Sequence, residues 1–235
     1  MNKQKKYGQN FLVSSSIAKF IVTTPKITKN DIVYEIGTGK GILTPLLCQH
    51  AKHVITTEID KKLYDQAIQN LSKFTNLTIK KGDGFKNEPK FDIFVSNLPY
   101  SKSRTAIQWL LQKKFSSAII MLQRDFAEKL MTNSTKERRA ISVLSQYGFN
   151  MKIIKKVKNT NFSPRPKVDS VILRITQNNT VSEELIETIN KIFSYRRKTI
   201  QNIGKNFDIT IKSDKRLEDM ENNEIIKLAK KISRI

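Results

Sequence analysis

Three side chains with hydrogen-bonding oxygens stand at matching places in the chain, each after a short apolar stretch. Glu58 closes HVITTE, Asp83 lies in the loop KKGDGF, and Asn97 opens NLPY directly after FDIFVS. Apolar runs of this kind are typical of buried strands. Because parallel strands end at one edge of a sheet, these groups are expected to face one crevice, where an acid can accept hydrogen bonds from ribose hydroxyls.

Each of these groups also has a simpler interpretation. An acid such as Glu58 can merely favour the start of a helix, although Asp60 suits that role better. An aspartate between two glycines, such as Asp83, is often only a turn residue, and NLPY can be an ordinary proline turn. The repetition of such groups at successive strand ends favours a binding site.

A glycine-rich segment, VYEIGTGKGILT, precedes all three groups. Gly37, Gly39 and Gly41 form G-x-G-x-G between a predicted strand and a predicted helix. Glycine permits a tight turn and lets the backbone approach a ligand closely, at the place where doubly wound sheets bind nucleotides. The dinucleotide fingerprint G-x-G-x-x-G fails, because position 42 is isoleucine.

The elements that must position these residues alternate between strands and helices. This alternation predicts an α/β, Rossmann-like sheet that is mostly parallel, with an antiparallel edge formed by the last two strands. Apolar residues after position 178 return at helical spacing, so we expect a small helical domain there. The expected domains are residues 1–178 and 179–235. Expected strands are 31–36, 52–58, 77–80, 91–96, 117–122, 151–157 and 170–175, and expected helices before residue 150 are 41–50, 61–71, 104–112, 125–131 and 138–147.

Composition limits the class of protein. The chain has 235 residues, 43 basic against 21 acidic, and a net charge of +22, which favours a polyanionic partner. Its single cysteine, Cys48, excludes an internal disulfide, and His50 and His53 lack metal-ligand spacing, so we expect no metal. No run of about 18 apolar residues and no signal peptide are seen. We therefore expect a cytoplasmic monomer with no membrane contact.

Several motifs, taken in order, resemble the rRNA adenine N6,N6-dimethyltransferase family. The resemblance covers nearly the whole chain and includes both the KsgA-type small-subunit enzymes and the erythromycin-resistance methylases. It is carried by GQNFL, EIGTGKGILT, EID, GD, NLPY, MLQRDFAEKL, FSPRPKVDSVILRI and YRRKTIQNIG.

The resemblance implies an enzyme that uses S-adenosyl-L-methionine to dimethylate adenosine in ribosomal RNA. By position, Asn10 and Leu12 would contact the cofactor, and Gly37 with the glycine turn (Gly39, Gly41) would hold its methionine end. Glu58 would take the ribose hydroxyls and Asp83 the adenine amino group. Asn97 would lie beside both the cofactor and the target amine.

The chemistry expected of NLPY needs no strong base. An adenine amine is a poor nucleophile because its lone pair is delocalised into the ring. The oxygens of Asn97 and Leu98 can accept its hydrogens and so direct the lone pair at the methyl group. Pro99 fixes the backbone, and Tyr100 and Phe162 are the expected stacking faces for a base that has left its stack. The alternative for Phe162 is a core position beneath a proline-rich loop.

Basic residues are expected to bind the RNA, by shape rather than by sequence. The favoured group is Arg165, Lys167, Arg196, Arg197 and Lys198. Each could instead be an ordinary surface charge, and the arginines near position 196 could dock the helical domain. Further candidates are Lys3, Lys5, Lys6, Arg104, Arg138 and Arg139.

The predicted function is N6,N6-dimethylation of two adjacent adenosines near the 3′ end of small-subunit rRNA, within a small subunit or its precursor. One alternative is a resistance methylase that modifies a single adenosine of large-subunit rRNA. NLPY, PKVDS and the RRKT segment favour the first, although Ser101-Lys102 departs from the usual bacterial pattern. An alternative of another class is a non-catalytic RNA-binding assembly factor. The broken fingerprint and the net charge argue against a nicotinamide oxidoreductase.

Overall fold

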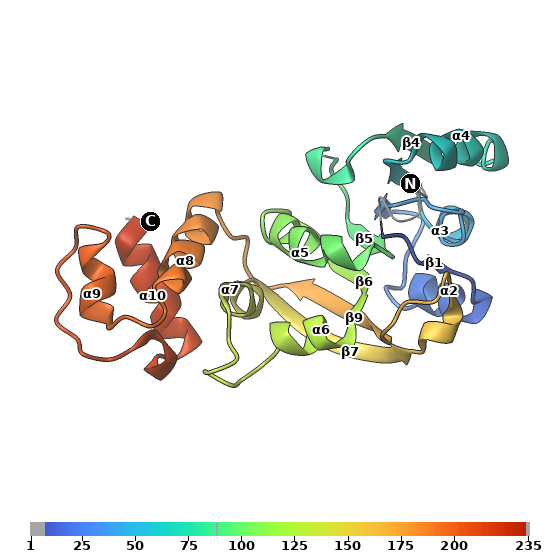
Figure 1. Cartoon of the computed structure of the whole chain (residues 1–235). Coiled ribbons are helices and arrows are strands. Elements are labelled where there is room, and N and C mark those ends of the chain that lie inside the picture. The colour runs from blue at the N-terminus through green and yellow to red at the C-terminus, as the bar shows by residue number, and fades with distance from the viewer. Residues whose placement is uncertain (1–7, 88, 234–235) are drawn as a thin grey trace. The chain divides into compact units, whose positions relative to one another are not determined.

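The computed structural model describes residues 8–87 and 89–233 (Figure 1). Its main element is a seven-stranded sheet in which β2, β3, β4, β5 and β6 run parallel and β9 pairs antiparallel with β6. The predicted mostly parallel α/β sheet with an antiparallel side is therefore confirmed. In spatial order the strands are β4 (Leu77–Lys81), β3 (His53–Glu58), β2 (Ile32–Ile36), β5 (Ile93–Ser96), β6 (Ser117–Gln123), β9 (Ser170–Gln177) and β7 (Phe149–Val157).

The chain divides into two compact units. One contains the described residues up to 106 together with 114–127 and 151–177, and holds most of the sheet. The other contains 107–113, 128–150 and the described residues from 178 onward. We call the first the sheet unit and the second the helical unit. The expected domain boundary at residue 178 stays a prediction.

Helices of the sheet unit connect successive strands. They are α2 (Ser15–Thr23), α3 (Thr44–His50), α4 (Lys61–Asn70) and the short 3-10 turns η1 (Gly84–Lys86), η2 (Tyr100–Lys102) and η3 (Asn159–Asn161); α5 (Ser103–Leu111) and α6 (Arg124–Leu130) begin in this unit. Asp60 caps α4, accepting hydrogen bonds at Oδ1 from the backbone N–H groups of Lys62 (2.8 Å) and Leu63 (3.2 Å). The helix-start role expected of Asp60 is thus confirmed.

The core of the sheet unit forms where α2 and α3 meet the central strands. Ile17, Ala18, Ile21 and Val22 bury one face of α2, following its helical period. Cys48 is buried among these apolar residues, as expected. A second, two-stranded sheet joins β1 (Phe11–Leu12) to β8 (Phe162–Ser163), and so ties the start of the described chain to a segment in its last third.

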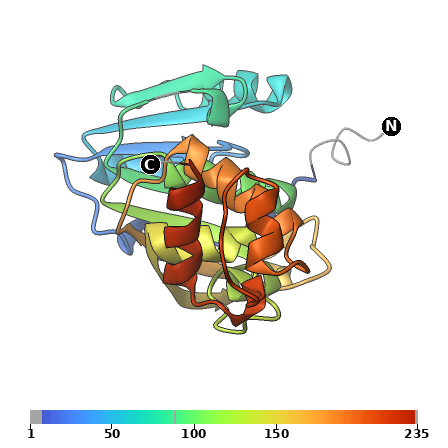
Figure 2. The same ribbon diagram turned by 90° about the vertical axis from the view of Figure 1, so that its left-hand side faces the viewer.

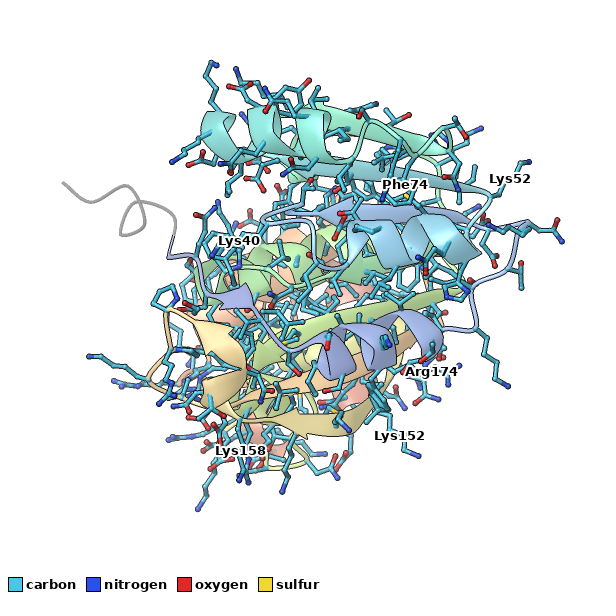
Figure 3. All side chains as sticks on the ribbon, turned by 90° about the vertical axis from the view of Figure 1, so that its right-hand side faces the viewer. Lys40, Lys52, Phe74, Lys152, Lys158 and Arg174 are labelled. Carbon is cyan, nitrogen blue, oxygen red and sulfur yellow. The ribbon has the colours of Figure 1, made fainter. Side chains whose placement is uncertain are left out.

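Basic side chains project from the surface of the sheet unit. Figure 3 shows Lys152, Lys158 and Arg174 around strands β7 and β9, and all three are exposed. No helix among residues 8–87 and 89–233 is long and apolar enough to cross a membrane. The same residues contain no group of three or more His, Cys, Asp or Glu side chains that could hold a metal ion.

The helical unit is built on three packed helices. Helix α10 (Asn222–Ser233) packs on both α7 (Ala140–Gly148) and α8 (Glu183–Ser194), and Figure 2 shows α8 and α10 side by side. The helical spacing expected for residues 185–193 and 225–232 is confirmed. Helix α9 (Ile200–Lys205) and η4 (Leu217–Asp219) complete the unit.

Candidate active site

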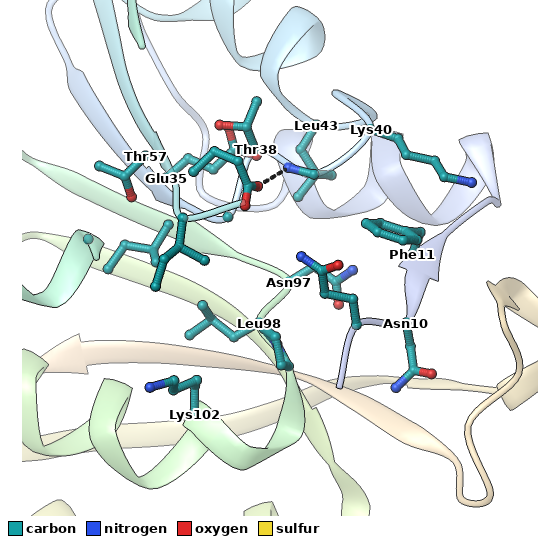
Figure 4. Close-up of a pocket in the computed structure, with 18 of the residues that line it drawn as sticks. Asn10, Phe11, Glu35, Thr38, Lys40, Leu43, Thr57, Asn97, Leu98 and Lys102 are labelled. Carbon is teal, nitrogen blue, oxygen red and sulfur yellow. Dashed lines mark hydrogen bonds between the residues drawn. The ribbon is translucent and has the colours of Figure 1, made fainter. Parts of the chain in front are cut away.

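A cavity of about 540 Å³ opens in the sheet unit where β2, β3 and β5 reach their carboxyl ends. Figure 4 shows Asn10, Asn97 and Leu98 around it. Nine of the predicted site residues line this cavity. They are Asn10, Leu12, Gly37, Gly39, Glu58, Asp83, Asn97, Leu98 and Pro99.

The glycine turn forms one wall of the cavity. Gly37, Gly39 and Gly41 have φ values of +87°, +56° and +77°, in the left-handed region that glycine adopts without strain. The predicted helix at 41–50 accordingly begins later, at Thr44, because this turn is not helical and Pro45 stands in the first helical turn. Gly41 shapes the turn by donating from its N–H to the Thr38 carbonyl (2.9 Å) and does not line the cavity.

Glu58 connects the glycine turn to the next turn of the chain. Its Oε2 accepts from the Gly39 N–H (2.8 Å), and its Oε1 accepts from the Asp60 N–H (2.9 Å). The carboxyl is buried, and this burial raises its pKa, while the two backbone hydrogen bonds oppose the shift. Each oxygen keeps a second lone pair, so Glu58 can accept two further hydrogen bonds from a diol in the cavity.

A second buried carboxyl, Glu35, lies in the same wall and was not predicted. It is 1% exposed, and it accepts hydrogen bonds from the hydroxyls of Thr44 (2.7 Å) and Thr56 (2.8 Å). Burial raises the pKa of Glu35 to about 7, and the charge of Glu58 adds to this shift. The available signal was an acid inside the apolar strand sequence IVYEI, since a buried carboxyl requires polar partners.

The loop after β4 holds Asp83 in place. Asp83 Oδ1 accepts from the Phe85 N–H (3.0 Å), and the buried Tyr34 hydroxyl donates to the Gly84 carbonyl (2.7 Å). A Cβ atom at Gly84 would collide with Thr57 Oγ1 and with the Ile36 side chain. Asp83 is therefore a turn residue, as the simpler interpretation expected. It also lines the cavity, so a turn position does not conflict with a place in a binding site.

The NLPY segment leaves β5 and borders the cavity with three of its four residues. Asn97, Leu98 and Pro99 line it together with Asn10 and Phe11, and Figure 4 labels four of these five residues. The Tyr100 ring is not part of the lining, and its hydroxyl lies 2.6 Å from Ser170 Oγ. Burial raises the pKa of Tyr100. Lys102, which was not predicted, also lines the cavity.

Phe162 lies outside the cavity. It pairs with Leu12 in the β1–β8 sheet and is 3% exposed within the core of the unit. This position agrees with the alternative of a core residue beneath a proline-rich loop. Stacking on a target base would require the ring to leave that core, and the role stays a prediction.

The basic residues fall in different places. Arg165 and Lys167 are exposed between β8 and β9, and Arg196, Arg197 and Lys198 are exposed after α8 in the helical unit. Their contact with RNA stays a prediction. Lys3, Lys5 and Lys6 lie outside the described residues.

Arg138 corrects one expectation, because it is not a free surface cation. It is 5% exposed, and its guanidinium donates to Asn222 Oδ1 (2.9 Å) and to the carbonyls of Leu217 (3.0 Å) and Met220 (2.8 Å). The residue therefore ties the segment before α7 to the start of α10, and sequence spacing alone could not reveal these distant acceptors.

Comparisons with known proteins point to one family. The family model described as Ribosomal RNA adenine dimethylase matches residues 1–233. A protein of Methanococcus aeolicus named Probable ribosomal RNA small subunit methyltransferase A is 37% identical over 96% of this chain and 88% of its own. The Clostridium botulinum Ribosomal RNA small subunit methyltransferase A is 37% identical over 93% of this chain and 83% of its own.

Solved structures show the same architecture. A dimethyladenosine transferase from Plasmodium falciparum superposes with a TM-score of 0.79 at 27% identity, covering 93% of this chain and 95% of that one. The 23S rRNA methyltransferase ErmE shares the fold, with a TM-score of 0.69 at 22% identity over 95% of this chain and 99% of that one.

Proposed function

Since the chain belongs to the ribosomal RNA adenine dimethylase family, we propose that it transfers methyl groups to the N6 atoms of two adjacent adenosines near the 3′ end of small-subunit rRNA. The observation that carries the proposal is the meeting of Glu58, Asp83 and Asn97 on one cavity at the strand ends. The names of the relatives from Methanococcus aeolicus and Clostridium botulinum support the small subunit as the source of the RNA.

The cavity fits S-adenosyl-L-methionine by its donor set. Oxygen acceptors of Glu58 and Asp83 lie on the same lining as the apolar side chains of Ile42 and Leu98, which suits a ligand with hydroxyls, an amino group and an aromatic base. When bound, this cofactor supplies an activated methyl group. Glu58 would accept hydrogen bonds from its ribose hydroxyls, Asp83 would accept from its adenine amino group, and the glycine turn would hold its methionine end.

Asn97 and Leu98 orient the adenosine amine. The Asn97 side-chain oxygen and the Leu98 carbonyl accept its two hydrogens, which directs the nitrogen lone pair toward the methyl carbon. With its lone pair so directed, the nitrogen would accept the activated methyl group, and the resulting cationic amine would release a proton to water. Catalysis therefore rests on positioning and on hydrogen-bond acceptors placed where positive charge develops.

The test uses radiolabelled S-adenosyl-L-methionine with two substrates offered separately. These are undermethylated small subunits and protein-free large-subunit rRNA, and the labelled nucleosides are then mapped. Dimethyladenosine at two adjacent small-subunit positions is the expected result. Label at a single large-subunit adenosine would overturn the proposal in favour of a resistance methylase. Absence of label in both, with the cofactor bound in calorimetry, would overturn it in favour of a non-catalytic assembly factor.

A further inference from the structure

Tyr100, the last residue of NLPY, is anchored to a strand far from it in the sequence. Its hydroxyl lies 2.6 Å from Ser170 Oγ, so one of the two hydroxyls donates a hydrogen bond to the other. Tyr100 is half-buried, whereas Ser170 is fully enclosed, with 0% of its surface exposed. Burial raises the pKa of Tyr100, so the phenol keeps its proton at neutral pH and can act as the donor.

The position of Ser170 is fixed by the sheet. Ser170 begins β9 and lies opposite Gln123 of β6. The residue before it, Asp169, accepts a hydrogen bond at Oδ1 from the Asn159 N–H (2.9 Å). The Asp169 carbonyl also accepts from the Arg124 N–H (3.3 Å). The backbone that carries the serine hydroxyl is therefore held on both sides, which makes the hydroxyl a rigid anchor.

The Tyr100 side chain borders the cavity of the sheet unit. Pro99 before it, and Ser101 and Lys102 after it, line that cavity, although the tyrosine itself does not. Pro99 has a φ of −54°, a value that its own ring restricts. The tyrosine is thus held at two points, at its backbone by the proline turn and at its hydroxyl by Ser170. A ring held at both ends keeps one orientation.

Burial alone does not give a serine hydroxyl such a partner in this protein. Ser117 in β6 and Ser145 in α7 are also buried, and their hydroxyls have no hydrogen-bond partner among the described residues. The contact between Ser170 and Tyr100 is therefore not an automatic result of enclosing a serine. Ser117 lies in the same unit and in a strand, so it offers a matched control.

We infer that Ser170 is a positioning residue for methyl transfer, which holds the ring of Tyr100 in the plane on which the target adenine stacks. The inference rests on the proposed function of the chain. A base that has left its stack needs an aromatic face. A ring free to rotate would offer that face for only part of the time, so the amine would meet the oxygens of Asn97 and Leu98 less often. Ser170 does not line the cavity, so it acts through Tyr100.

The first experiment measures methyl transfer to undermethylated small subunits over a range of subunit concentrations. Ser170→Ala should lower kcat roughly 10-fold. The KM for the subunits and the affinity for the cofactor should be unchanged, because the change concerns the orientation of a base that is already bound. Ser117→Ala removes a buried hydroxyl that has no partner, so its kcat should stay within about twofold. Equal kcat values for Ser170→Ala and Ser117→Ala would overturn the inference.

The second experiment asks whether Ser170 acts through Tyr100. Tyr100→Phe keeps the ring and removes the hydroxyl, so it should lose as much kcat as Ser170→Ala, and the double variant should lose no more than either. Tyr100→Ala removes the ring itself and should lower kcat roughly 100-fold. Adding Ser170→Ala to Tyr100→Ala should then have no further effect. Losses that multiply in the double variants would contradict action through the tyrosine.

The inference and the proposed function fail in different ways. Absence of transfer by the unaltered protein to either rRNA would remove both. Transfer by the unaltered protein with equal kcat values for Ser170→Ala and Ser117→Ala would leave the proposed function intact and remove only this inference. Transfer to large-subunit rRNA would change the proposed substrate, and the same variants are then compared on that RNA, because the inference concerns the adenine ring. Urea unfolding and calorimetric cofactor affinity verify that each variant is folded.

Discussion

Two cavities of this chain are opposite in chemistry. The cavity of the sheet unit gathers oxygen acceptors, with the carboxyls of Glu35 and Glu58 both buried. The helical unit holds a second cavity, of about 320 Å³, which gathers N–H donors, with five basic side chains against one carboxylate. The basic residues are Lys136, Arg138, Arg196, Arg197 and Arg216. Acceptors suit hydroxyls and amines, whereas donors suit phosphate oxygens. In a chain with a net charge of +22, the first cavity thus carries three carboxyls, those of Glu35, Glu58 and Asp83.

The cavities also differ in how their residues are held. Glu58 is fixed by backbone N–H groups of turns that directly follow strands. Arg138 is fixed by acceptors from the far end of the chain. Turns that follow strands therefore hold Glu58 in the first cavity, whereas long-range packing holds Arg138 in the second. The following predictions test this division, from the largest expected effect to the smallest.

Asn97→Ala should have the largest effect, because it should abolish most methyl transfer while binding is retained. Loss of one acceptor at the site of developing charge is expected to lower kcat by about 10³-fold. Affinity for RNA should be unchanged. The measurement is single-turnover methyl transfer, with cofactor affinity from calorimetry as the control. Full turnover by this variant would sink the proposed role of the amide.

Arg138→Ala tests whether the helical unit depends on a buried cation. Removal leaves the Asn222 amide oxygen and the carbonyls of Leu217 and Met220 without their donor, so the free energy of unfolding should fall by about 3 kcal/mol. Arg196→Ala is the matched control, because Arg196 is exposed, and its effect should be within about 0.5 kcal/mol. Urea unfolding checks both, and equal stability of the two variants would contradict the assigned role.

Glu35 should make the stability of the chain depend on pH. Burial raises its pKa from 4.5 to about 7 in the folded state, so the unfolded chain loses this proton first as pH rises. Stability attributable to Glu35 should therefore fall between pH 4.5 and about 7 and level off above, by roughly 3 kcal/mol in total. Glu35→Gln should abolish that fall. Urea unfolding at several pH values measures it, and parallel pH curves for both proteins would refute the assignment.

Glu58→Gln should weaken the cofactor site without unfolding it. The amide loses the charge and replaces one acceptor oxygen with a donor, so cofactor affinity should fall roughly 10-fold. Asp60→Asn is the control, since it keeps an oxygen to cap α4. Calorimetric titration with S-adenosyl-L-methionine decides, and a larger loss for Asp60→Asn would reverse the assigned roles.

Sequence reasoning predicted the parts of the molecule that short segments determine. The alternation of strands and helices, the glycine turn and the positions of Glu58, Asp83 and Asn97 all follow from local pattern and from the rule that parallel strands end together. The glycine turn and the three side chains all lie in short segments that directly follow a strand, so neighbouring residues determine their positions. Local pattern and this rule thus account for seven of the nine predicted residues that line the cavity, and the family resemblance supplied the other two, Asn10 and Leu12.

What sequence reasoning missed depends on partners distant in the chain. Glu35 is polar in sequence, but its burial follows from Thr44 and Thr56, which come from two other elements. Arg138 resembles any surface cation until the start of α10 encloses it. Spacing carries no information about such partners, because it describes only neighbours along the chain.

The pairing of β1 with β8 has a consequence for the synthesis of the protein. Leu12 lies opposite Phe162, so 150 residues separate the two halves of this contact. Closing a loop of that length costs roughly 4 kcal/mol of chain entropy, more than a two-residue strand recovers by itself. The Asn10–Leu12 wall of the cavity must therefore wait for the rest of the sheet unit. A chain still emerging from a ribosome therefore lacks one wall of this cavity until its eighth strand has been made.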